Sequence, residues 1–210
     1  MHGDNPTLAE ALDEELLRAG FAQGDASLDV LATALNNPSP RHRVLALRGV
    51  VRRDVATNSI WRNALGDGDV DVRREALGLI AHVEGLQDDL LRVVTGLLDD
   101  EDALVVDAAV FALGEHLDVG AVERLCEIAM NHDDARCRES AVAALGAIGD
   151  ERGRPAILAA LDDKPPVRRR AIVALSNFEG PDIDEALARA AEDRDWQVRA
   201  AVNQLGRDND

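Results

Sequence analysis

Apolar residues recur along the chain at helical spacing, and turns rich in Asp, Pro and Gly separate the apolar segments. Leu90, Leu91, Val94 and Leu98, for example, follow one another at steps of one, three and four residues, which places them on one face of an α-helix. The pattern predicts an all-α protein in which a longer helix (A) alternates with a shorter helix (B). The predicted A helices span 7–19, 40–53, 70–83, 102–116, 134–148, 165–178 and 195–205. The predicted B helices span 27–36, 57–65, 86–98, 119–131, 151–162 and 181–192.

One motif opens most of the predicted A helices: an acidic turn, an apolar anchor, usually an arginine, and an Ala-rich stretch that ends in Leu. The anchor recurs at intervals of 33, 32, 30 and 31 residues, at Val72, Val105, Cys137, Val167 and Val198. A sustained period of this length predicts a stack of helix pairs in which each pair buries its apolar face against the next.

Four of the five anchors are followed directly by an arginine, at Arg73, Arg138, Arg168 and Arg199. Each arginine lies close in sequence to an acidic turn. We expect these side chains to form a ladder of Arg–Asp pairs along the stack, with a structural role rather than a role in ligand binding.

Residues 133–163 carry the motif most completely and include Ile148-Gly149-Asp150 between the two helices. This segment resembles the HEAT-like repeat first associated with phycobilisome lyases. The resemblance implies a right-handed α-solenoid, a superhelix of antiparallel helix pairs whose B helices line the concave groove. We expect a single repeat domain over 1–210, with a degenerate cap repeat over 5–39, five repeats over 40–192 and a terminal capping helix over 193–206.

The chain is strongly acidic, with 40 acidic and 23 basic residues and a net charge of −17 spread over both halves. Such a field repels nucleic acid and anionic membranes. No apolar stretch approaches the roughly 20 residues that a membrane-spanning helix needs, and no secretory signal is visible at the N-terminus. We therefore expect a soluble cytoplasmic protein, a monomer or weak homodimer, that binds neither nucleic acid nor membranes.

The predicted concave face combines charged residues with a small apolar centre, which favours an extended peptide or a partner helix with basic and apolar side chains. Its candidate binding residues are Arg92, Val93, Glu123, Arg124, Glu127, Met130, Pro155, Ala156, Ala159, Glu185 and Arg189. The arginine-rich A helix 40–53, which the resemblance places on the convex side, stays open as an alternative interface.

Catalytic and metal-binding patterns are incomplete, so we predict a non-catalytic protein without a cofactor. Asp67, Asp69 and Asp71 alternate as in the start of a calcium loop, but Val72 and Gly78 replace the glycine and the glutamate that such a loop requires. The alternative left open is an enzyme or accessory factor of the bilin-lyase type, with a ligand in the groove.

The two cysteines and the two tryptophans also fit the repeat. Cys126 and Cys137 occupy apolar positions, so we expect buried free thiols rather than a zinc site or a redox pair. Trp61 aligns with a core leucine, and Trp196 opens the last predicted helix. We expect both rings to serve in packing, with Trp196 covering the preceding helix pair.

Overall fold

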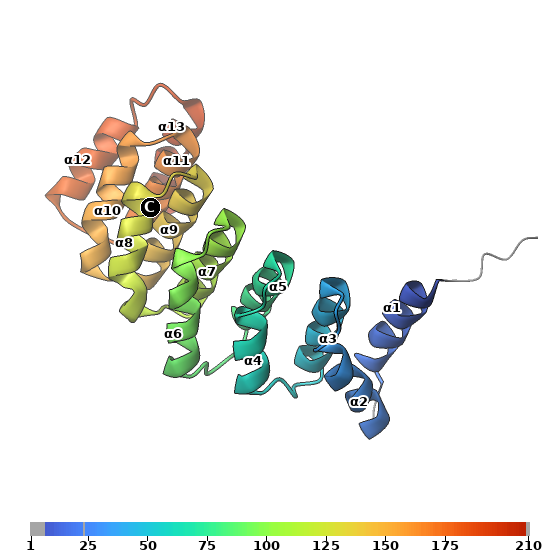
Figure 1. The fold of residues 1–210 in the computed structure, drawn as a ribbon. Coiled ribbons are helices and arrows are strands. Elements are labelled where there is room, and N and C mark those ends of the chain that lie inside the picture. The colour runs from blue at the N-terminus through green and yellow to red at the C-terminus, as the bar shows by residue number, and fades with distance from the viewer. Residues whose placement is uncertain (1–6, 23, 209–210) are drawn as a thin grey trace, which may run out of the picture. The chain divides into compact units, whose positions relative to one another are not determined.

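The computed structural model describes residues 7–22 and 24–208, and within these ranges the chain forms helices and no strand (Figure 1). The all-α fold expected from the sequence is thereby confirmed. The helices group into two compact units, residues 1–83 (unit 1) and residues 84–210 (unit 2). The single repeat domain expected over 1–210 stays a prediction.

Unit 1 alternates longer and shorter helices, as the pattern of apolar residues predicts. Its helices are α1 (Leu8–Ala19), α2 (Asp25–Ala34), α3 (Pro40–Arg52), α4 (Asn58–Leu65) and α5 (Val70–Ile80). The A helices α1, α3 and α5 pack against one another in chain order, while α2 packs against α1 and α3, and α4 packs against α5.

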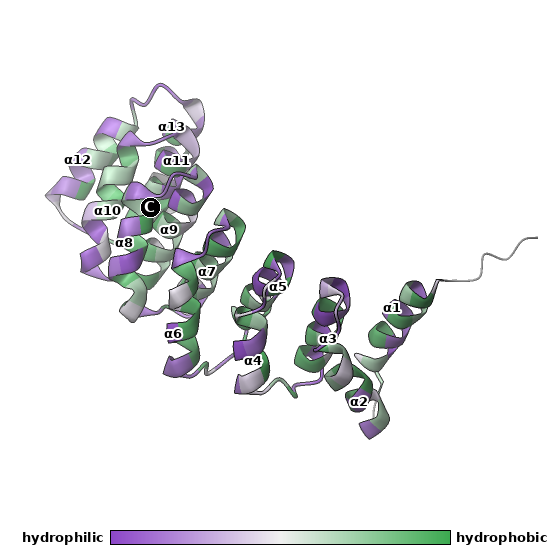
Figure 2. Cartoon of the chain, in the orientation of Figure 1, coloured by the Kyte–Doolittle hydropathy of each residue, from purple (hydrophilic) through white to green (hydrophobic). Residues whose placement is uncertain are grey.

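Unit 2 continues the alternation, and short 3₁₀ segments flank several of its B helices. Its B elements are α6 (Asp88–Gly96) with η1 (Leu97–Asp99), η2 (Val119–Ala121) with α8 (Val122–Asn131), η3 (Glu151–Gly153) with α10 (Arg154–Ala159) and η4 (Ala160–Asp162), and α12 (Pro181–Ala190). Its A helices are α7 (Ala103–Glu115), α9 (Ala135–Ile148), α11 (Pro165–Leu175) and α13 (Trp196–Asp208). The A helices pack in the order α7, α9, α11, α13, and α8 packs against α9 and α10. Most helices carry both hydrophobic and hydrophilic residues (Figure 2), as amphipathic helices of a stack must.

The turns that precede the A helices explain where these helices begin. Asp69, Asp102 and Asp134 each accept a hydrogen bond from the backbone N–H two residues later, at 2.8 to 3.0 Å. Carboxylates at this position satisfy N–H groups that the first helical turn leaves without a partner. The helices α3, α11 and α12 instead begin with proline, whose fixed φ suits the first helical turn.

Small residues set the spacing between neighbouring A helices of unit 2. A Cβ atom added to Gly146 of α9 would lie 2.5 Å from the Cβ and 2.8 Å from the Cα of Ala174 in α11. One added to Gly114 of α7 would lie 3.0 Å from the Cβ of Ala144 in α9. The prevalence of alanine and glycine in these helices thus allows their backbones to approach closely.

The predicted Arg–Asp ladder is confirmed in unit 2 for Arg138 and Arg168, whereas Arg199 donates to the backbone carbonyl of Asp193 at 2.6 Å. Arg138 donates to both carboxylate oxygens of Asp163 at 2.6 and 2.8 Å and to the carbonyl of His132 at 2.6 Å. Arg168 donates to Asp193 at 2.7 and 2.9 Å and to the carbonyl of Asp163 at 2.8 Å. Arg138 and Arg168 therefore each tie the turn before their own helix to the turn of the next repeat, and these hydrogen bonds hold the pKa of Asp163 and Asp193 below the usual range.

The ladder has a gap at the interface of α7 and α9. Val106, which is buried, stands at the arginine position, and His132 stands at the aspartate position. His132 Nδ1 accepts a hydrogen bond from the N–H of Asp134 at 3.1 Å, the same turn contact that Asp193 makes with the N–H of Asp195 at 2.7 Å. The imidazole thus keeps the turn closed although the ion pair is absent.

Three of the turns from A to B helices adopt a left-handed backbone conformation at one aligned position. Its φ angle is 55° at Asp54, 50° at Leu117 and 68° at Gly149. Glycine adopts this conformation freely and aspartate tolerates it, whereas a leucine side chain is strained there.

Candidate partner-binding surfaces

The eleven residues predicted to bind a partner all belong to B elements of unit 2. Eight of them are exposed: Arg92, Glu123, Glu127, Met130, Pro155, Ala159, Glu185 and Arg189. Val93 and Arg124 are half-buried. We call the exposed surface of α6, α8, α10 and α12 the B face of unit 2.

Ala156 departs from the prediction, because its side chain is only 2% exposed. Across α10 and the start of η4 the buried positions are Ala156, Ile157 and Ala160, so the i, i+4 pair of alanines faces inward. Helical spacing of the apolar residues would instead place Ile157, Leu158 and Leu161 in the core; Ile157 is buried, but Leu158 and Leu161 are only half-buried. Ala156 therefore contributes to the core and not to the surface.

Ion pairs connect neighbouring elements across the B face of unit 2. Arg124 of α8 pairs with Asp99 of η1 and with Glu127 of its own helix. Arg154 of α10 pairs with Asp182 of α12. The structure thus brings the charged residues of successive repeats together, and each of these arginines lies among carboxylates.

Carboxylates dominate what the B face offers to solvent. The side chains of Asp99, Glu123 and Glu127 are 70%, 81% and 56% exposed, whereas that of Arg124 is 39% exposed. At the end of α8, Met130 is 51% exposed. The face therefore presents a flexible apolar side chain on a helix that is rich in exposed carboxylates.

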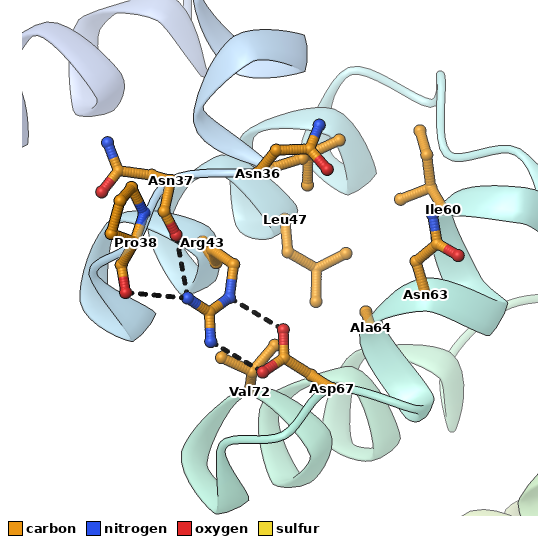
Figure 3. A pocket seen from close by; sticks show the side chains of 11 residues that line it. Asn36, Asn37, Pro38, Arg43, Leu47, Ile60, Asn63, Ala64, Asp67 and Val72 are labelled. Atoms are coloured by element: carbon orange, nitrogen blue, oxygen red, sulfur yellow. Dashed lines mark hydrogen bonds and ion pairs between the residues drawn. The ribbon is translucent and has the colours of Figure 1, made fainter.

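A second surface feature is a cleft of about 470 Å³ in unit 1, between the end of α2 and α4 (Figure 3). Leu35, Leu47, Ile60 and Ala64 supply its apolar lining. Among the polar lining residues are Asn36 and Asn63, and their side-chain amides make no hydrogen bond with any part of the chain that the structure describes. Sequence reasoning did not find this cleft, because its depth depends on how two helices and a turn meet.

One wall of this cleft is an ion pair. Arg43 donates to both carboxylate oxygens of Asp67 at 2.7 and 2.8 Å and to the carbonyls of Asn37 and Pro38 at 2.8 and 3.1 Å. Burial alone would raise the pKa of Asp67, but the hydrogen bonds from Arg43 and from the N–H of Asp69 outweigh it, and the pKa falls below the usual range. Arg43 and Asp67 thus form a pair of the same kind as Arg138 and Asp163, and both side chains are already hydrogen-bonded, whereas the amides of Asn36 and Asn63 are free to bind a ligand.

The two thiols do not have the environment of reactive cysteines. Cys137 is fully buried and donates to the carbonyl of Ala103 at 3.2 Å, and burial raises its pKa to about 11. Cys126 is half-buried, lies 3.7 Å from the carbonyl of Arg152, and burial raises its pKa as well. Both stay protonated near neutral pH. Within residues 7–22 and 24–208, no three His, Cys, Asp or Glu side chains converge as metal ligands.

The two tryptophans differ in burial. Trp61 is 3% exposed, which confirms its packing role, whereas Trp196 is 67% exposed, so the prediction that it covers the preceding pair is wrong. Trp196 is the first residue of α13, and the equivalent residues of α9 and α11, Ala135 and Pro165, are only half-buried. A large ring at this position extends beyond the core.

Sequence and structure comparisons agree on the class of fold. A family model for HEAT repeats matches residues 58–145 and 122–206. No curated protein sequence shows significant similarity to the chain. No helix in the described part of the chain is both long and apolar enough to span a bilayer.

Solved structures similar to this chain are helical repeat proteins and engineered proteins. An engineered protein aligns with a TM-score of 0.64 and 20% identity over 85% of this chain and 94% of its own. YibA of Escherichia coli aligns with a TM-score of 0.64 and 16% identity over 96% and 75%, respectively. A designed armadillo repeat protein in complex with the peptide (KR)4 aligns with a TM-score of 0.57 and 16% identity over 92% and 97%. At these identities the likeness concerns the fold.

Proposed function

The chain belongs to the HEAT repeat family, and we propose that it is a non-catalytic protein-interaction module whose B face of unit 2 binds a segment of another protein. The observation that carries this proposal is Met130, 51% exposed at the end of α8, on a helix that also presents the exposed carboxylates Glu123 and Glu127. A repeat solenoid exposes the same side of successive helices, and this geometry suits extended or helical ligands.

The charge of this face determines which kind of protein segment it would bind. Asp99 and Glu127 both contact Arg124, and Glu123 and Asp150 both contact Arg152, so four carboxylates share two guanidinium groups and leave a surplus of negative charge. A basic segment would relieve that surplus, and an apolar side chain of the segment would cover Met130. The candidate binding residues are Arg92, Val93, Glu123, Arg124, Glu127, Met130, Pro155, Ala159, Glu185 and Arg189.

A structural neighbour supports a basic ligand for this class of fold, since the designed armadillo repeat protein is in complex with the peptide (KR)4. The present chain combines a related fold with a net charge of −17, which would attract a cationic peptide and speed its association.

Two labelled peptides test the proposal by fluorescence anisotropy: Lys-Arg repeated four times, and Lys-Leu-Arg-Leu repeated twice. We expect both to bind and the second to bind more tightly, because only the second can cover Met130. Glu123→Lys combined with Glu127→Lys should weaken binding about tenfold, equivalent to about 1.4 kcal/mol. Met130→Asp should weaken only the leucine-containing peptide, whereas Arg124→Glu should tighten both.

Glu115→Lys provides the matched control, because Glu115 is an exposed carboxylate of the A helix α7. It changes the net charge by the same amount per residue and should alter affinity less than twofold. An equal loss of affinity in this control, or no binding of either peptide at 0.15 M salt, would reject the B face as the interface.

A further inference from the structure

The A helices of unit 2 carry a surface cleft whose chemistry differs from that of the B face. A cleft of about 410 Å³ lies between the A helices α11 and α13, lined among others by Arg169, Arg170, Val173, Trp196 and Leu205. Trp196 is 67% exposed and Val173 is 47% exposed. An exposed tryptophan and an exposed valine therefore line the same cleft, and a tryptophan at a hollow is a side chain typical of binding hot spots.

The two arginines of this cleft are not part of the ladder. In the run 168–170, Arg168 is buried and bonded to Asp193, whereas the next two side chains lie at the surface cleft. Arg170 approaches Glu139 only to 3.6 Å, and Arg169 makes a long hydrogen bond of 3.4 Å to Gln197. Most of their N–H groups therefore stay available to a ligand.

Trp196 adds a further donor. Its indole ring makes no hydrogen bond and no ring contact with the described residues. The cleft thus combines an apolar wall with two guanidinium groups and an indole N–H, which can only donate, and the amides of Gln197 and Gln204 supply its acceptors.

We propose that this cleft is a second docking site, for a segment of another protein that carries carboxylates beside a large apolar side chain. The apolar side chain would pack against Trp196 and Val173, and the carboxylates would accept hydrogen bonds from Arg169 and Arg170, for which guanidinium geometry is well suited. Because this site prefers acidic ligands and the B face of unit 2 prefers basic ones, the two would recruit different partners. The inference stands independently of the proposed function.

Two other occupants fit less well. A single-stranded nucleic acid could stack on Trp196, but it brings a phosphate for every base, and the cleft offers only two cations, Arg169 and Arg170, on a chain of net charge −17. A second copy that paired through the same cleft would place Arg169 and Arg170 of one copy against those of the other, which like-charge repulsion disfavours.

Peptide display tests the proposal directly. A library of random 12-residue peptides is selected on the wild-type chain and depleted on Trp196→Ala. We expect the enriched peptides to combine Asp or Glu with Leu, Phe or Trp at a spacing of three or four residues. Binding of the best peptide should shift the fluorescence of Trp196 to shorter wavelength, while the buried Trp61 serves as the internal reference.

The affinity of the best peptide for variants of the chain then distinguishes binding at this cleft from binding at other surfaces. We expect losses of about tenfold or more for Trp196→Ala, for Val173→Asp and for the pair Arg169→Glu and Arg170→Glu, as for removal of hot-spot residues. Arg189→Glu, a charge reversal on the B face, should change affinity less than twofold. Circular dichroism of each variant verifies that the helices are intact.

Several results would overturn the proposal. These are a library that yields no Trp196-dependent peptide, enriched peptides that are basic, and an oligothymidine that binds Trp196 more tightly than the selected peptides do. Sedimentation equilibrium provides another: dimerisation that Trp196→Ala abolishes would make a second copy the occupant. Failure of the basic peptides on the B face would leave this site unaffected, so the two proposals fail separately.

Discussion

Two neighbouring interfaces of unit 2, α7 with α9 and α9 with α11, are built alike in their apolar parts and differently in their polar parts. Both place a glycine of one A helix against an alanine of the next, Gly114 on Ala144 and Gly146 on Ala174. Only the second interface carries the ion pair of Arg138 with Asp163. Where the arginine is replaced by Val106, the matching aspartate is replaced as well, by His132.

This difference indicates that the arginine and the aspartate of a ladder pair are needed together, and that the stack does not require such a pair at every interface. A buried arginine without its carboxylate, or a carboxylate without its arginine, would be costly, whereas an apolar residue in the same place costs little. The α7–α9 interface is therefore stable without the ion pair because both members are absent together, and the turn contact of the aspartate is retained by His132.

Removal of Arg138 should have the largest effect. Arg138→Ala leaves Asp163 and the carbonyls of His132 and Asp133 without their donor. We expect a loss of about 3 kcal/mol in the free energy of unfolding, at the lower end for buried pairs because both side chains keep some exposure. Urea unfolding measures it, and Arg136→Ala, which removes an exposed pair with Asp134, is the control and should change little. Equal effects of both variants would contradict a special role of the ladder.

Substitution of the two closely packed glycines should have the next largest effect, and the two variants should differ from each other in stability. Gly146→Ala forces the backbones of α9 and α11 apart, so overpacking should exceed the gain in helix propensity and destabilise the protein by about 2 kcal/mol. Gly114→Ala meets its neighbour at 3.0 Å, and the two terms should nearly cancel. Thermal unfolding of both variants measures this difference, and a stabilised Gly146→Ala would show that the helices can separate at no cost.

The gap in the ladder can be filled by design. Val106→Arg alone buries a guanidinium without a carboxylate and should destabilise the protein, whereas addition of His132→Asp supplies the missing partner. A double-mutant cycle should give a favourable coupling of about 1 to 2 kcal/mol. A coupling near zero would mean that the α7–α9 interface lacks the geometry of its neighbour.

Acid should weaken the two interfaces unequally. The pKa of Asp163 is lower in the folded chain than in the unfolded chain, so the stability that its ion pair supplies is present above an unfolded pKa of about 3.9 and is lost as the pH falls through the folded pKa. We expect Arg138→Met to unfold with a shallower pH dependence than wild type below about pH 4. Urea midpoints from pH 7 to pH 2 measure it, and identical slopes would exclude this contribution.

The smallest expected effect concerns the turn after α7. Leu117 adopts a φ of 50°, where the aligned residue after α9 is Gly149. Leu117→Gly should relieve strain and stabilise the protein by less than about 1 kcal/mol, since glycine also loses more conformational entropy on folding. Gly149→Leu should have the opposite sign, and thermal midpoints of the two variants test the pair.

The sequence predicted what repeats in this molecule. The order and approximate positions of the helices, the ladder of Arg138 and Arg168 and the burial of Trp61 all follow from positions that recur at one period, whereas α5 and α11 end three residues before their predicted ends. A residue type that recurs in every copy is one that every copy needs, so comparison of the copies identifies it.

What the sequence could not predict depends on a single copy. Ala156 lies on a helix of six residues, too short to establish a periodicity, and alanine is compatible with either face. Tryptophan is a residue type typical of the core, but the exposure of Trp196 depends on the direction in which the side chain of the first residue of α13 points. The cleft beside Asn36 and Asn63 depends on how far apart the neighbouring helices lie, and residue types alone do not determine that separation.

The ladder also bears on how such a chain can change its length. Arg138 bonds to a carboxylate 25 residues later, and Arg168 does the same. Excision of one whole period, residues 139–168, would bring Asp193 to the place that Asp163 now holds relative to Arg138. Unequal recombination between these copies would therefore preserve the pairing of Arg138 with an aspartate. A crossover that separates Val106 from His132, by contrast, would create an unmatched aspartate or an unmatched arginine. The gap thus marks a junction at which the number of repeats is harder to alter.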